Sequence, residues 1–130
     1  MQRNMDLIRA LLLKLESLPI EPGGVVTISS DAPEVSVEGF DEGQIYYHLQ
    51  LIEEAGFVDT AGARPMMGIG FRGLTWAGHD FLDSVRDPKI WEKTKKGVSA
   101  AGGFSIELMK DLAKGLLKKQ IEEYTGVKLQ

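Results

Sequence analysis

The sequence predicts an α+β fold in which several helices accompany a small antiparallel sheet. The clearest helix lies within residues 41–58 (DEGQIYYHLQLIEEAGFV), where Ile45, Leu49 and Ile52 recur at i, i+4 and i+7 and so share one apolar face. Two segments rich in β-branched residues flank Ser-Asp-Ala-Pro and predict short strands. The strands are residues 25–29 and 34–37, and the further helices are residues 4–18, 76–85, 88–97 and 105–124.

Composition indicates an ordinary globular protein. A chain of 130 residues with 43% hydrophobic and 26% charged residues fits one compact domain with a real core. No cysteine is present, so disulfides and thiolate metal sites or nucleophiles are excluded. This cysteine usage fits a reducing cytoplasm.

The N-terminal segment predicts an amphipathic helix capped by Asn4 rather than a signal peptide. Asp6, Arg9 and Lys14 interrupt the apolar run, and no small-residue cleavage site follows it. No stretch approaches the roughly 20 apolar residues that a membrane span requires. We therefore expect a soluble cytoplasmic protein with no membrane contact.

The net charge of −4 conceals a strong asymmetry along the chain. Between Lys14 and Arg64 there are ten acidic residues and no lysine or arginine, whereas the chain from Arg86 onward is basic. Because a charge distribution steers association, this asymmetry bears directly on partners.

Local signals set the ends of the central helix and the elements after it. Asp41 and Gln44 can form a capping box, and Gly56 can adopt the positive φ that ends a helix. Residues 57–60 predict a strand, 61–67 a loop tip and 68–75 a returning strand. The helices that follow have the expected caps Thr75, Asp87 (before Pro88) and Ser105, and Gly102-Gly103 predicts a break before the last of them. The apolar residues of the helix over 76–85 are Trp76, Phe81, Leu82 and Val85.

Two segments resemble winged-helix proteins. The pattern I-x-x-H-L-x-x-I-E-E-A-G-F-V resembles the third helix of that fold, which leads into the wing, and L-T-x-x-G-x-x-F-L resembles the segment after the wing. The chain departs from the fold between residues 24 and 40, where the second helix belongs but no helical periodicity occurs. The resemblance implies a winged-helix-like core over residues 1–87, and a helical extension over 88–130 that packs or dimerises within one compact domain overall.

Nearly the whole chain is similar to an uncharacterised bacterial and prophage family, domain of unknown function 2513. The segments that carry this resemblance are MDLIRALLLKLE, GFDEGQIYYHLQLIEEAGFV, GLTWAGHDFLDSVRDPKIWEKTK and GGFSIELMKDL. Membership implies a small winged-helix-like protein and transfers no activity or catalytic residue.

No catalytic, cofactor or metal site is predicted. The match to G-x-G-x-x-G over residues 68–73 lacks the strand–helix setting of a dinucleotide site, which favours a glycine-rich strand. His48 and His79 have no metal-ligand spacing; His48 lies beside the buried stripe, where a hydrogen-bonded structural histidine is expected. His79-Asp80 would need a nucleophile nearby to act as base and orienter, and none can be named. We expect no enzyme.

The outward face of the central helix is the candidate interaction face: Tyr46, Tyr47, Gln50 and Leu51. In a winged helix this face enters the major groove, but here it has no positive charge to release counter-ions from DNA. Gln50 could read adenine, and only Arg64 and Arg72 on the wing could contact phosphates. Exposed aromatic residues on a face without positive charge favour a protein interface. The alternative without a function is a solvated helix face that carries a few apolar residues.

The last helix carries a wide apolar arc that predicts packing or dimerisation. The residues of this predicted dimer helix are Ile106, Met109, Leu112, Leu116 and Leu117. The arc could pack on the rest of the chain, lie on an anionic membrane, or pair with a second copy, and we favour a homodimer. The sequence thus predicts a non-enzymatic protein-interaction module; the alternative is a DNA-binding transcriptional regulator that uses the wing and the C-terminal lysines.

Overall fold

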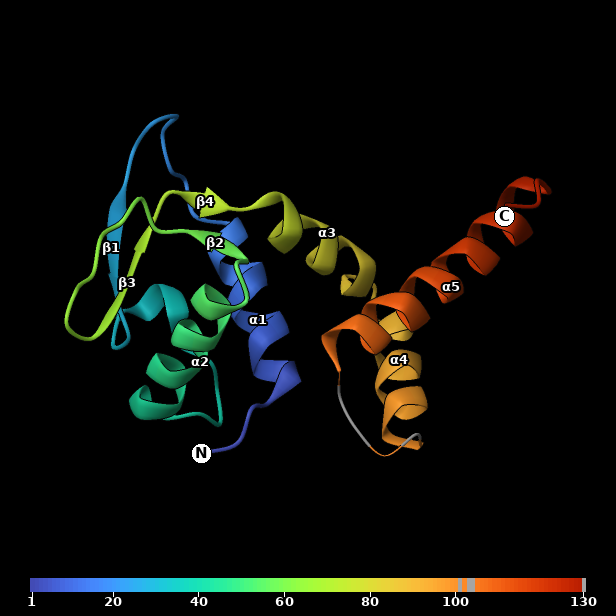
Figure 1. The fold of residues 1–130 in the computed structure, drawn as a ribbon, viewed down its shortest axis with the longest axis horizontal. Coiled ribbons are helices and arrows are strands. Elements are labelled where there is room, and N and C mark those ends of the chain that lie inside the picture. The colour runs from blue at the N-terminus through green and yellow to red at the C-terminus, as the bar shows by residue number, and fades with distance from the viewer. Residues whose placement is uncertain (101, 103–104, 130) are drawn as a thin grey trace. The chain divides into compact units, whose positions relative to one another are not determined.

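The computed structural model describes residues 1–100, 102 and 105–129 (Figure 1). The fold is α+β, as predicted, with five α-helices, one 3₁₀ turn and two two-stranded antiparallel sheets in the described residues. The chain divides into two compact units, residues 1–80 and 81–130, with the division inside helix α3 (Trp76–Val85). The prediction of a core over 1–87 and an extension over 88–130 in one compact domain stays a prediction.

Two helices organise the first unit. Helix α1 (Met5–Glu16) begins where the Asn4 side chain accepts from the Leu7 amide, as predicted. Helix α2 (Glu42–Glu54) begins at the predicted capping box between Asp41 and Gln44. Gly56, with φ of +75°, ends it. The two helices pack together (Figure 1), and the core lies between them. The most buried residues of this core are Leu7, Leu11, Leu12, Leu15, Leu49 and Ile52.

The strands pair in a split arrangement. Strand β1 (Val26–Ser29) pairs antiparallel with β3 (Gly68–Phe71), with Ile28 opposite Ile69. Strand β2 (Val58–Asp59) pairs instead with β4 (Gly73–Leu74). The predicted returning strand over 68–75 therefore consists of two short strands, each with a different partner, and α2 packs against β2 and β3.

The predicted strand over residues 34–37 is wrong. Pro33–Val35 form a 3₁₀ turn, η1, in which the Val35 amide bonds to Ala32 O and the Ser36 amide to Pro33 O. The fixed φ of Pro33 suits the first position of such a turn. Val35 is fully buried there, so its β-branched side chain is covered without a strand.

Two of the three glycines in the 68–73 motif, Gly68 and Gly70, are explained by close packing. A Cβ atom on Gly68 would overlap the Ile28 carbonyl oxygen of the neighbouring strand. A Cβ atom on Gly70 would overlap Ala63 Cβ and lie 2.8 Å from Thr60 O. Gly73, by contrast, has no atom within 4 Å of that position. The motif thus lies in β3 and β4, in agreement with the prediction of a glycine-rich strand.

Thr75 links the start of α3 to the end of α2 through hydrogen bonds. Its amide donates to Phe57 O and its hydroxyl to Gly56 O, while the same hydroxyl accepts from the Gly78 amide as a helix cap. A Cβ atom on Gly78 would overlap the Phe57 carbonyl oxygen, so only glycine fits there. Trp76, two residues earlier, points away and is 90% exposed.

The second unit contains a pair of packed helices. Helix α4 (Pro88–Ala100) begins at Asp87, whose carboxylate accepts from the Lys89 and Ile90 amides. It extends three residues beyond the predicted end. Gly102 has φ of +91°, while Gly103 of the predicted break lies outside the described residues. Helix α5 (Ile106–Thr125), capped by Ser105, packs on α4 closely enough that a Cβ atom on Gly97 would overlap Leu112.

Leu49→Ala is expected to lower the free energy of unfolding of residues 1–80 by about 2–5 kcal/mol, because it empties a fully buried position in α2. Urea titration followed by the NMR signals of residues 1–80 measures this. Met66→Ala, at a side chain that is 91% exposed, should change it by less than about 0.5 kcal/mol. Equal midpoints for the two variants would contradict the placement of Leu49.

Gly70→Ala is expected to cost about 1–3 kcal/mol, because the new methyl group has no room against Ala63 and Thr60. Gly73→Ala, three residues along the same chain segment, is the matched control and should leave stability within about 0.5 kcal/mol of the original. The same urea titration applies. A Gly70 variant as stable as the Gly73 variant would show that β3 and the 60–63 turn do not meet this closely.

Candidate interaction surfaces

The predicted interaction face of α2 is only half exposed. Tyr46, Tyr47, Gln50 and Leu51 are each partly covered, and Glu54 is exposed at the end of the helix. No lysine or arginine occurs in α2. The face therefore combines two aromatic rings and a leucine with an acidic edge.

Gln50 has a structural contact that sequence reasoning missed. Its Nε2 donates to Gly68 O at 3.2 Å, which ties α2 to the start of β3. Reading adenine with a glutamine requires both the donor and the acceptor of the amide. Because the donor is engaged within the chain, Gln50 is poorly placed for that contact.

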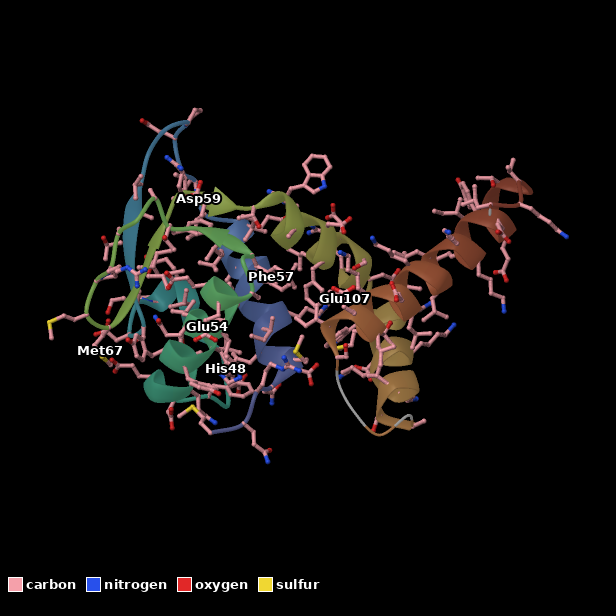
Figure 2. The ribbon with its side chains drawn as sticks, in the orientation of Figure 1. His48, Glu54, Phe57, Asp59, Met67 and Glu107 are labelled. Carbon is pink, nitrogen blue, oxygen red and sulfur yellow. The ribbon has the colours of Figure 1, made fainter. Side chains whose placement is uncertain are left out.

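His48 is the structural histidine that its position predicts. The ring is buried, with 1% of the residue exposed (Figure 2). Its Nε2 accepts from the Asn4 amide at 2.8 Å, so Nδ1 carries the proton and donates to Gln44 O, also at 2.8 Å. The Tyr47 ring packs edge-on against it, with ring centres 5.4 Å apart. Nε2 thus ties α2 to the cap of α1, while the bond from Nδ1 stays within α2 and fixes the orientation of the ring.

His79 lies in a different environment. Its Nδ1 is 3.8 Å from a Glu16 carboxylate oxygen, and half of its side chain is exposed. No group of three or more histidine, aspartate or glutamate side chains within residues 1–100, 102 and 105–129 could hold a metal ion. Within the same residues, no helix is long and apolar enough to cross a membrane.

The two arginines expected to contact phosphates differ in their surroundings. Arg72 forms an ion pair with Asp59, in which Nε at 2.9 Å and a terminal nitrogen at 2.8 Å both contact the carboxylate oxygen Oδ2. Arg64 is exposed in the loop between β2 and β3. Hydrogen bonds from the Ala61 amide and then from Arg72 lower the pKa of Asp59, so this carboxylate stays charged beside Arg72.

The β2–β3 loop also exposes apolar side chains that sequence reasoning did not single out. Met66 and Met67 lie at its end, and Figure 2 shows Met67 where the chain enters β3. The sequence signal for these exposed side chains was the pair of adjacent methionines in a segment rich in turn residues.

The predicted dimer helix is partly used inside the second unit. Met109, with its neighbour Ala113, is fully buried, whereas Ile106, Leu112, Leu116 and Leu117 are half exposed. Further along α5, Ile121 and Tyr124 are 47% and 92% exposed. The apolar arc is thus covered near the start of α5 and open near its end.

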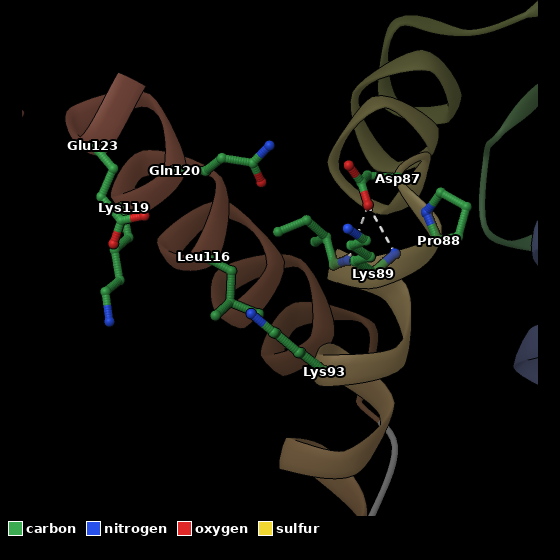
Figure 3. Close-up of a pocket in the computed structure, with 9 residues that line it drawn as sticks. Asp87, Pro88, Lys89, Lys93, Leu116, Lys119, Gln120 and Glu123 are labelled. Carbon is green, nitrogen blue, oxygen red and sulfur yellow. Dashed lines mark hydrogen bonds between the residues drawn. The ribbon is translucent and has the colours of Figure 1, made fainter. Parts of the chain in front are cut away.

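A groove separates the start of α4 from the second half of α5 (Figure 3). Its volume is about 610 Å³, and the apolar side chains Ile90 and Leu116 form part of its lining. Three lysines (Lys89, Lys93 and Lys119) and two acidic residues (Asp87 and Glu123) surround them. Asp87 is engaged in capping α4.

The two units carry opposite net charges. Residues 1–80 contain twelve acidic and five basic side chains, which gives −7. Residues 81–130 contain seven acidic and ten basic side chains, which gives +3. The predicted asymmetry of the sequence is therefore a difference between two folded units.

The pKa of Asp59 is expected to lie below its ordinary value of 3.8, and Arg72→Gln should raise it only part of the way back. The Ala61 amide, the larger cause, remains in that variant. A carboxylate with a lowered pKa stabilises the fold above its ordinary pKa, and this contribution is lost as the pH falls through the folded value. Carbon-detected NMR titration of the Asp59 carboxyl measures both proteins, and identical midpoints would contradict the ion pair.

Comparison with known proteins gives a family without an assigned activity. The family model described as "Hypothetical protein (DUF2513)" matches residues 2–105. The chain is also 31% identical over 124 residues to an "Uncharacterized protein" of Haemophilus influenzae (strain ATCC 51907 / DSM 11121 / KW20 / Rd), covering 93% of this chain and 99% of that relative. No solved structure matches the chain. The chain belongs to the DUF2513 family of hypothetical proteins.

Proposed function

We propose that this chain is a winged-helix-like, non-enzymatic module that binds another protein through the outer face of α2. The order of elements supports the fold assignment. Helix α1, strand β1, the turn η1, helix α2 and strands β2 to β4 follow one another, and η1 occupies the place of the second helix. This order supports the winged-helix-like fold only. The proposed function depends on the outer face of α2.

The observation that carries the function is an aromatic face without positive charge on a strongly acidic unit. Tyr46, Tyr47 and Leu51 remain partly accessible in α2, and residues 1–80 carry a net charge of −7. Interface centres are enriched in aromatic residues and depleted in charge. DNA affinity, in contrast, comes largely from lysine and arginine contacts that release counter-ions.

The contacts of two other residues also favour a protein partner over DNA. Gln50 donates to Gly68 O, and Arg72 pairs with Asp59. The alternative function is a DNA-binding regulator that uses Arg64 and the lysines of residues 81–130, whose net charge is +3. A transcriptional role for a bacterial or prophage protein remains the alternative that experiment must separate from the proposal.

The non-enzymatic assignment rests on how the two histidines are used. His48 is buried with both ring nitrogens bonded inside the fold, so it has no accessible proton to transfer. His79 lies near Glu16, and no nucleophile is assigned beside it. A cytoplasmic location and a homodimer complete the proposal.

A photo-crosslinking amino acid placed at Tyr46 should trap a discrete protein in the native host cell. The same amino acid at Ser36, an exposed position after η1, should give no such product. Leu51→Gln should abolish the Tyr46 adduct because it removes apolar area from the face, whereas Glu54→Gln, at the exposed edge, should preserve it. Thermal unfolding checks that each variant is folded.

Digestion of the adduct decides between the two functions. Adducts that survive nuclease and disappear with protease support the proposal. Nuclease-sensitive adducts, or tight DNA binding in an anisotropy titration at physiological salt, would favour the regulator instead.

A further inference from the structure

We propose that the second half of α5 is a dimer interface, at which two copies of the chain pair antiparallel through Leu117, Ile121 and Tyr124. This inference rests on the homodimer of the proposed function, for which it names the interface, and it uses a different surface from the α2 face. One can therefore fail while the other holds.

The first observation is that one apolar stripe of α5 is covered at one end and open at the other. At 100° per residue, Tyr124 lies within about 20° of Ala113 around the helix axis. Ala113 is fully buried, yet Tyr124 is 92% exposed. The cover is α4, which has 13 residues against the 20 of α5, and Figure 1 shows α5 extending well past it.

The open end has the shape of a packing site. A depression of about 280 Å³ lies along it, lined by Leu117, Gln120, Ile121, Tyr124 and Thr125. Its three large apolar side chains follow the i, i+4, i+7 spacing of a helix–helix seam. The expected occupant is therefore another helix.

Charge indicates what kind of helix fits. The last part of α5 has Glu122 and Glu123 and no basic residue in its final turn, although the backbone dipole already makes that end negative. A partner helix with positive charge beside apolar side chains therefore complements this end. The preceding part of α5 itself does so, because Lys114 and Lys118 flank Leu117.

Sterics and charge then select the antiparallel arrangement. In a parallel pair, α4 of one copy would meet α4 of the other, since both cover the same face around Met109 and Ala113. In an antiparallel pair with the axis near Ile121, only the open ends overlap, and the acidic end of each helix lies beside the lysines of the other. The two-fold axis makes the contact self-complementary and closed.

Light scattering of the full chain at tens of micromolar should report a dimer. Ile121→Asp should give a folded monomer, because it places a charge at the centre of the interface. Leu108→Asp is the matched control: Leu108 lies on the opposite face of the same helix, is 54% exposed, and its variant should remain dimeric. Circular dichroism shows whether helicity is retained. A monomeric full chain, or a dimer that survives Ile121→Asp, would overturn the proposal.

The absence of cysteine from the chain allows a direct test of orientation. Under mild oxidation, a mixture of Leu117→Cys and Tyr124→Cys chains should form a mixed disulfide, since these positions face each other across the axis. Tyr124→Cys alone should stay uncrosslinked. Efficient crosslinking between two Tyr124→Cys chains would show a parallel pair and would contradict the antiparallel arrangement.

Discussion

Residues 1–80 depend on three places where backbone meets backbone without room for a Cβ atom. Gly68 lies against the Ile28 carbonyl, Gly70 against the 60–63 turn, and Gly78 against the Phe57 carbonyl. These contacts bring together β1 and β3, the turn after β2 and β3, and the segment after α2 and α3. Protein interiors are packed too densely to absorb an added methyl group at such points without displacement. Three glycines thus set how closely the strands, the 60–63 turn and the start of α3 approach one another.

The polar residues of α2 show how that unit uses its side chains. His48 and Gln50 are the residues that most suggest chemistry or recognition, yet both bond to backbone atoms of other elements. A buried polar group must find such partners, because leaving it unpaired costs about 1–3 kcal/mol. Tyr46, Tyr47 and Leu51 remain partly exposed on the face of α2 that also carries Gln50. Within this one face, Gln50 therefore has a structural contact, and the proposed recognition depends on its neighbours.

Local signals in the sequence were predictive, whereas pairings over long distances were not. The capping box of Asp41 and Gln44 and the caps Asn4, Thr75 and Asp87 depend on residues a few positions apart, and the structure contains all of them. The split pairing of β2 and β3 depends on which distant strand is available, so no local pattern gives it. The 34–37 segment failed as a strand because Val35 is buried through tertiary packing in η1. For α3 the helical phase follows from Gly78, and Trp76, about 200° away around the axis, then faces outward.

The opposite charges of residues 1–80 and 81–130 give this protein two distinct electrostatic surfaces on one chain. Near its sequence isoelectric point of about 5.2, the total charge vanishes while the two units still differ strongly in sign. At that pH, unlike units of neighbouring molecules therefore attract one another, and added salt weakens this attraction by screening it.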